Sequence, residues 1–173
     1  ELRNDGPFDR NPHYVRLTSA GHNHKHTGLE NEGFVGIGVE KGEKYRFSVW
    51  ARVPQGGEGR LKVVLADRNT HGRSQDLASA KIKVTTTDWQ KYTVELTPDQ
   101  TCAHAVLRVF LRHPDTTAVD LEHLSLFPVD TWKGHENGLR KDLAQKLADI
   151  HPGVFRFPGG CIVEGTDLDT RYQ

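Results

Sequence analysis

From residue 14 to about residue 127, apolar and polar side chains alternate along the chain with a period of two. The clearest stretch covers residues 44–53. Its apolar members are Tyr45, Phe47, Val49, Ala51 and Val53, and the residues between them include Arg46, Trp50 and Arg52. Successive side chains of a strand point to opposite faces, so this pattern predicts a strand with one face in a core and the other mostly in water.

The same alternation recurs in several other short segments. These candidate strands cover residues 14–19, 34–39, 61–65, 80–84, 92–96, 105–111 and 119–127. Breaks rich in Gly, Pro, Thr and Asp separate them, for example at 54–57, 85–88 and 113–115. Such residues favour turns between strands. About eight short strands in one domain predict a mainly β fold, an antiparallel β-sandwich of the jelly-roll type.

After Pro128 the pattern changes to a helical period. Leu139, Leu143, Leu147 and Ile150 recur every three or four residues, which predicts a helix with Asn137 as its N-cap. Residues 152–153, Pro-Gly, would end it, and residues 154–157 read as a short strand followed by the turn 158–160. A single helix and strand cannot bury both faces of a parallel sheet. We therefore expect a sandwich at residues 1–127 and a fragment of a larger α/β domain at 128–173.

The composition narrows the classes of function. The chain has 173 residues, 23 of them Lys or Arg and 23 Asp or Glu, so its formal net charge is zero. A neutral chain has no broad field to gather nucleic acid, and no apolar run reaches the roughly 18 residues that a membrane span needs. We therefore expect neither nucleic acid nor membrane as a partner. There is no Met, so Glu1 is not a translation start, and we interpret the chain as a processed or excised piece.

Two features raise the question of metal binding. His22, His24 and His26 alternate, so on a strand they would share one face and could hold Zn²⁺ or Cu²⁺; on a solvated loop they would not. Asp120 begins the last predicted strand and could ligate a structural Ca²⁺ together with backbone carbonyls. Neither pattern is specific, and we expect no metal and no cofactor. Cys102 and Cys161 do not decide between a disulfide and two thiols.

Aromatic residues on the polar faces of strands suggest sugar binding, because a sugar's C–H face packs on such rings. Trp50 stands between Arg46 and Arg52, and Phe110 between Arg108 and Arg112, so the two rings could line one groove. The alternative is that a loop or a neighbouring domain covers them. A glycosidase needs paired carboxylates. The candidates are Glu164, Asp167 and Asp169, whose alternative is a solvated loop.

Three segments resemble the α-L-arabinofuranosidases of glycoside hydrolase family 51. They are LFPVDTWKG at 126–134, NGLRKDL at 137–143 and RFPGGCIVEG at 156–165, followed by Arg171 and Tyr172. The sandwich before them resembles, more loosely, the carbohydrate-binding-module-like domain of larger members. The resemblance implies a parent enzyme that hydrolyses terminal non-reducing α-L-arabinofuranosyl residues with retention, on a (β/α)₈ barrel.

The same resemblance implies roles for individual residues. Gly159, Gly160 and Cys161 would follow an early barrel strand and line the substrate pocket, since active sites lie at the C-terminal ends of barrel strands. Both catalytic glutamates of the family belong to later strands, so this chain is expected to hold no catalytic residue. Its partners would be an arabinan- or arabinoxylan-type polysaccharide and the rest of the barrel, and the parent would be secreted or periplasmic. A stand-alone glycan-binding module and a purely structural sandwich are the alternatives.

Overall fold

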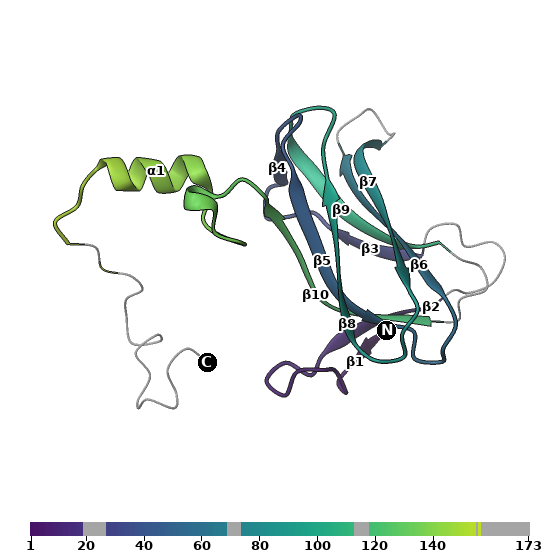
Figure 1. The fold of residues 1–173 in the computed structure, drawn as a ribbon. Coiled ribbons are helices and arrows are strands. Elements are labelled where there is room, and N and C mark those ends of the chain that lie inside the picture. Colours follow the sequence, from purple (N-terminus) through teal and green to yellow (C-terminus); the bar gives the residue numbers. More distant parts are fainter. Residues whose placement is uncertain (19–26, 69–73, 113–117, 155, 157–173) are drawn as a thin grey trace.

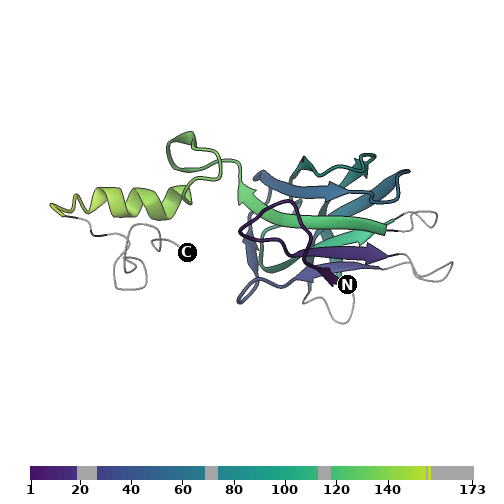
Figure 2. The same cartoon turned by 90° about the horizontal axis from the view of Figure 1, so that it is seen from below.

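The fold was taken from a computed structural model, which describes residues 1–18, 27–68, 74–112, 118–154 and 156. Two antiparallel sheets pack face to face (Figures 1 and 2). A short 3₁₀ helix, η1 (Trp132–Gly134), and then an α-helix follow the last strand, and the α-helix lies away from the sheets. This confirms the predicted mainly β fold, with a sandwich followed by a helix. None of the helices in the described part of the chain has the length and apolarity to cross a membrane.

Each sheet is built from strands that are distant in sequence. The first sheet has the order β1 (Leu2–Arg3), β2 (Tyr14–Thr18), β10 (Ala118–Pro128), β5 (Tyr45–Arg52), β8 (Gln90–Leu96). The second has the order β3 (Gly28–Asn31), β9 (Cys102–Leu111), β6 (Gly59–Asp67), β7 (Gln75–Val84), and β4 (Ile37–Val39) also pairs with β9. The sequence pattern missed β1 and β3, which are too short to show a period. The pattern also predicted a strand that starts at Phe34, whereas β4 starts at Ile37 and Phe34 is fully exposed.

The core lies between the sheets and consists of the predicted alternating residues. In β5, Phe47, Val49 and Ala51 are completely buried, and in β6 so are Leu61 and Val63. These side chains face one another across the two sheets in one continuous cluster. The polar residues between them point to the two outer faces, which are where a ligand or a second domain can reach the sandwich.

The connection after β10 is a closed loop that leads into a helix. Thr131 forms a β-bridge with Arg140 and donates a hydrogen bond to the carbonyl of His135. The helix, α1 (Lys141–Asp149), begins after Arg140. The prediction of Asn137 as N-cap was therefore wrong. Asn137 has a φ of 52°, in the left-handed region that Asn tolerates better than most residues, and it lies in the loop before the helix.

The helix stands apart from the sandwich (Figure 1), and the side chains of its apolar stripe are largely exposed. Leu139, Leu143, Leu147 and Ile150 are 66%, 52%, 50% and 69% exposed. The predicted stripe is thus real, but nothing in the described part of the chain packs on it. Beyond the helix, Val154 and Arg156 belong to no strand, contrary to expectation, and none of the described strands pairs with them. Phe155 and Phe157 lie outside the described residues.

Candidate functional site

Trp50 lies on the outer face of the first sheet, half-buried under the loop that joins β1 to β2. The ring of Phe8, from that loop, stands perpendicular to the indole at a centroid distance of 5.5 Å. Phe8 also stacks on the imidazole of His123 at 4.4 Å. The same loop is anchored by Asn11, whose Nδ2 donates to Oε1 of Glu122 at 3.1 Å. Trp50 is therefore one member of an aromatic group with polar neighbours, and not an isolated platform.

A bulge in β10 places His123 in this group. The register between β10 and β5 shifts between Glu122 and Ser125, and His123 has a φ of 47°, which is uncommon for a residue with a side chain. Bulges change the direction in which side chains point, and they are frequent near functional sites. Glu122 remains buried beneath, with one carboxylate oxygen 3.6 Å from Nε2 of His123. No feature of the sequence pattern predicted this bulge.

A buried ion cluster lies next to this group on the same face, two residues further along β5 and β10. Asp120 is completely buried and accepts hydrogen bonds from Nε of Arg16 at 2.6 Å and from Nε of Arg52 at 2.9 Å. The hydrogen bond to Asp120 raises the pKa of Arg16. Burial lowers the pKa of Arg52, but the hydrogen bonds that it donates to Asp120 and Tyr14 outweigh burial and raise it.

The contacts of Asp120 decide whether it can ligate Ca²⁺, as the sequence suggested it could. Two guanidinium groups occupy both of its carboxylate oxygens, and a cation would be repelled there, so the site does not fit a calcium ligand. Among the described residues, no group of three or more His, Cys, Asp or Glu could hold a metal ion. Asp120 instead joins β2, β10 and β5 across the sheet.

Phe110 lies on the other side of the molecule from Trp50. It belongs to β9 in the second sheet and packs with Val64, Ala66 and Val106 on that sheet's outer face. The guanidinium of Arg112 lies 5.9 Å from its ring centroid. The prediction that Trp50 and Phe110 line one groove was therefore wrong. The sequence gives each ring's face within its own strand but not the sheet to which that strand belongs.

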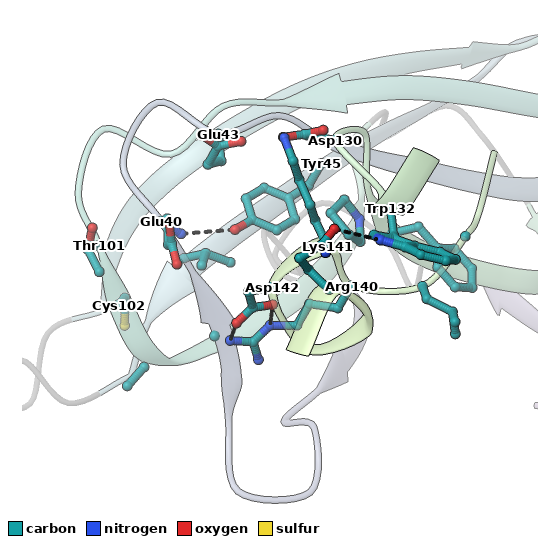
Figure 3. A pocket seen from close by; sticks show the side chains of 18 of the residues that line it. Glu40, Glu43, Tyr45, Thr101, Cys102, Asp130, Trp132, Arg140, Lys141 and Asp142 are labelled. Atoms are coloured by element: carbon teal, nitrogen blue, oxygen red, sulfur yellow. Dashed lines mark hydrogen bonds and ion pairs between the residues drawn. The ribbon is translucent and has the colours of Figure 1, made fainter. Parts of the chain in front are cut away.

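A hollow lies where the sandwich meets the connection to α1 (Figure 3). It has a volume of about 1110 Å³. Glu40, Glu43 and Tyr45 line it from the sandwich, and Trp132, Lys141 and Gln145 line it from the connection and the helix. We call it the junction cleft. The sequence pattern did not predict this site for Trp132, because the cleft forms between segments about ninety residues apart along the chain.

Short contacts hold the two walls of the junction cleft in place. The backbone N–H of Val129 donates to the carbonyl of Lys44 at 2.8 Å, and Arg46 pairs with Glu136 at 3.2 Å. Within the far wall, Nζ of Lys141 donates to Asp130 at 2.8 Å, which raises the pKa of Lys141. Contacts between the sandwich and the connection after β10 therefore hold the walls of the cleft in place.

The remaining predicted site residues lie outside the described part of the chain. These are His22, His24, His26, Gly159, Gly160, Cys161, Glu164, Asp167 and Asp169. Their proposed roles stay predictions.

Comparison with protein families assigns the sandwich. A family model described as a carbohydrate binding domain matches residues 4–117, which contain strands β2 to β9. The chain belongs to this carbohydrate binding domain family. A solved structure of a family 4 carbohydrate-binding module has the same fold, with a TM-score of 0.51 at 19% identity over 67% of this chain and 70% of its own.

The similarity of this carbohydrate binding domain extends beyond the sandwich. An extracellular exo-α-L-arabinofuranosidase of Streptomyces chartreusis is 41% identical over 162 residues, 93% of this chain. A GH51 α-L-arabinofuranosidase solved with arabinose superposes with a TM-score of 0.84 at 30% identity and covers 99% of this chain. The chain spans 18% of the Streptomyces protein and 28% of the solved one. It thus resembles a part of such enzymes, and the similarity to arabinofuranosidases that the motifs predicted is confirmed.

Proposed function

We propose that the chain is a non-catalytic part of an α-L-arabinofuranosidase that removes terminal non-reducing α-L-arabinofuranosyl residues, with retention, from arabinan- or arabinoxylan-type polysaccharides. The observation that carries this proposal is the 99% coverage by the GH51 structure, which includes the connection and α1 as well as the sandwich. An independent binding module would be expected to match over the sandwich alone.

In the parent enzyme, α1 is a helix of the catalytic barrel. Its exposed stripe, Leu139, Leu143, Leu147 and Ile150, is then the side that packs on the barrel strands. A helix that leaves about half of each of four large aliphatic side chains in water is poorly stabilised alone. Gly159, Gly160 and Cys161 follow this helix in sequence, and on this proposal they line the arabinose pocket.

The sandwich itself has two candidate roles. As a binding module, it contacts polysaccharide through Trp50 on one outer face or Phe110 on the other. As a brace, it holds the barrel without touching sugar, and the cover of Phe8 over Trp50 favours this second role. A stand-alone glycan-binding module remains the alternative to the whole proposal, and the uncovered stripe on α1 argues against it.

Release of arabinose from 4-nitrophenyl α-L-arabinofuranoside tests the proposal. The full-length protein is expected to release arabinose with retained anomeric configuration, whereas the chain of 173 residues is expected to be inactive. A well-folded full-length protein that does not cleave this substrate would overturn the proposed function. Calorimetry of the 173-residue chain with arabinan and arabinoxylan oligosaccharides separates the two roles of the sandwich, since only a binding module gives heat that Trp50→Ala or Phe110→Ala reduces.

A further inference from the structure

The junction cleft combines an aromatic ring with several hydrogen-bonding groups. Trp132 is half-buried in its far wall, and its Nε1 donates to Oε1 of Gln145 at 3.2 Å, which fixes the indole in the cleft (Figure 3). On the sandwich side, the hydroxyl of Tyr45 accepts a hydrogen bond from the backbone N–H of Glu40 at 2.9 Å. Two aromatic side chains from separate parts of the fold are therefore held at one cleft.

The charges around the cleft favour a neutral ligand. Three cations line the cleft: Arg140 pairs with Asp142 at 2.7 Å, Lys141 pairs with Asp130 at 2.8 Å, and Nζ of Lys133 lies 4.2 Å from the ring centroid of Trp132. Glu40 and Glu43 add two further carboxylates. An anionic ligand such as a phosphate or an acidic polysaccharide would therefore meet no excess of positive charge. Carboxylates and amides are instead suited to accept hydrogen bonds from hydroxyl groups, while an indole face packs on C–H groups.

The direction of α1 gives the cleft its place in the parent enzyme. A helix of a (β/α)₈ barrel follows a strand and runs back along it, so its N-terminal end lies at the face where the strands end. That face carries the active site. The cleft is lined by the first residues of α1, including Lys141 and Asp142. If α1 is a barrel helix, as the proposed function has it, the cleft opens beside the active site and not on the opposite side of the barrel.

We propose that the junction cleft binds the neutral pentose backbone of the polysaccharide from which the barrel removes arabinose. Trp132 packs on the sugar ring with the indole face opposite the Lys133 ammonium. Glu43 accepts hydrogen bonds from the sugar hydroxyls, and Gln145 accepts or donates them. This inference rests on the proposed function and deepens it, because it names the part of the chain that makes a polymer a better substrate than a small arabinoside. The site is separate from both Trp50 and Phe110.

The first experiment is kinetic and uses the full-length protein. The quantity measured is the ratio of kcat/KM for arabinoxylan to kcat/KM for 4-nitrophenyl α-L-arabinofuranoside. We expect this ratio to fall about tenfold in Trp132→Ala, as for the loss of one stacking contact worth roughly 1.4 kcal/mol, and severalfold in the milder Glu43→Gln. Phe34→Ala removes a fully exposed aromatic ring that does not line the cleft and is the matched control, with an unchanged ratio.

The outcomes separate the two proposals. If the wild type fails on the small arabinoside, the proposed function is wrong. If the wild type cleaves both substrates and Trp132→Ala and Glu43→Gln leave the ratio unchanged, the cleft does not bind the backbone and the proposed function stands. A second measurement titrates xylohexaose and α-1,5-arabinohexaose into the 173-residue chain by NMR. Shifts around Trp132 support the inference, and shifts confined to Trp50 or their absence at millimolar sugar overturn it.

Discussion

Arg52 and Asp120 face each other directly across β5 and β10, and Nε of Arg52 lies 2.9 Å from Oδ2 of Asp120. Asp120 has no exposed surface, while the side chain of Arg52 is 21% exposed. On the other side of Asp120, Arg16 of β2 lies opposite it in the ladder and binds both carboxylate oxygens. One carboxylate thus joins three strands whose sequence positions are far apart.

Removal of this carboxylate is expected to destabilise the sandwich strongly. Asp120→Ala leaves two guanidinium groups without their partner in a largely dry site, a change that costs roughly 3–5 kcal/mol in buried pairs. Glu95→Ala is the control, because it breaks only the exposed pair with Lys44 and is expected to cost less than about 1 kcal/mol. Urea unfolding followed by tryptophan fluorescence measures both. Equal losses in the two variants would contradict the role given to Asp120.

Tyr14 is expected to make the stability fall at alkaline pH. Burial, together with the hydrogen bond to Asp5, raises the pKa of Tyr14 above its ordinary value of about 10. From about pH 10 upward the unfolded chain loses the Tyr14 proton while the folded chain keeps it, so the free energy of unfolding decreases as the pH rises. Urea unfolding between pH 9 and pH 11 (roughly the range of tyrosine titration) should show a shallower decrease in Tyr14→Phe.

Asp5→Asn is the companion variant to Tyr14→Phe. It removes the carboxylate that raises the pKa of Tyr14 but leaves the phenol buried. We expect a pH dependence between that of the wild type and that of Tyr14→Phe. The account would fail if the wild type and Tyr14→Phe lost stability equally over this range.

Gly59 is expected to tolerate no side chain. It is buried at the start of β6, and a Cβ at this position would lie 2.6 Å from Cγ2 of Val119 and 3.2 Å from Cγ2 of Val53. Overpacking of this kind costs roughly 1–3 kcal/mol, so Gly59→Ala should lower the melting temperature. Gly38→Ala is the matched control, because a Cβ there would meet no atom within 4 Å. Calorimetric melting that ranked the two variants in the reverse order would refute this packing argument.

The apolar stripe of α1 should matter only in the full-length protein. Leu143 is 52% exposed in this chain, so Leu143→Lys is expected to change the stability of the 173-residue chain by less than about 0.5 kcal/mol. In the parent the same change would place a charge against the barrel and lower its melting temperature by several degrees. Lys146→Glu alters an exposed polar position of the same helix and should be neutral in both. A neutral Leu143→Lys in the parent would mean that the barrel does not cover the stripe.

The alternation of residues was sufficient to predict most of the sandwich. A strand such as β5 contains eight residues with every second one apolar, and this pattern depends only on the geometry of the strand. It did not reveal β1 or β3, because strands of two and four residues form only when a neighbour supplies their hydrogen bonds. The stripe on α1 was also predictable, but its start was not, since Asn137 adopts its conformation within a loop closed by Thr131 and Arg140.

The sequence by itself determined which side of each strand meets the core, that the pattern changes after Pro128, and that the motifs around residues 126–165 are those of arabinofuranosidases. Only the tertiary structure decided that Trp50 and Phe110 lie on opposite outer faces, that Asp120 holds two arginines, and that Trp132 and Tyr45 meet at one cleft. The reason is physical. The local period of the backbone determines on which face of its strand each side chain lies. Pairings between residues far apart in the chain determine to which sheet a strand belongs and where clefts form between elements.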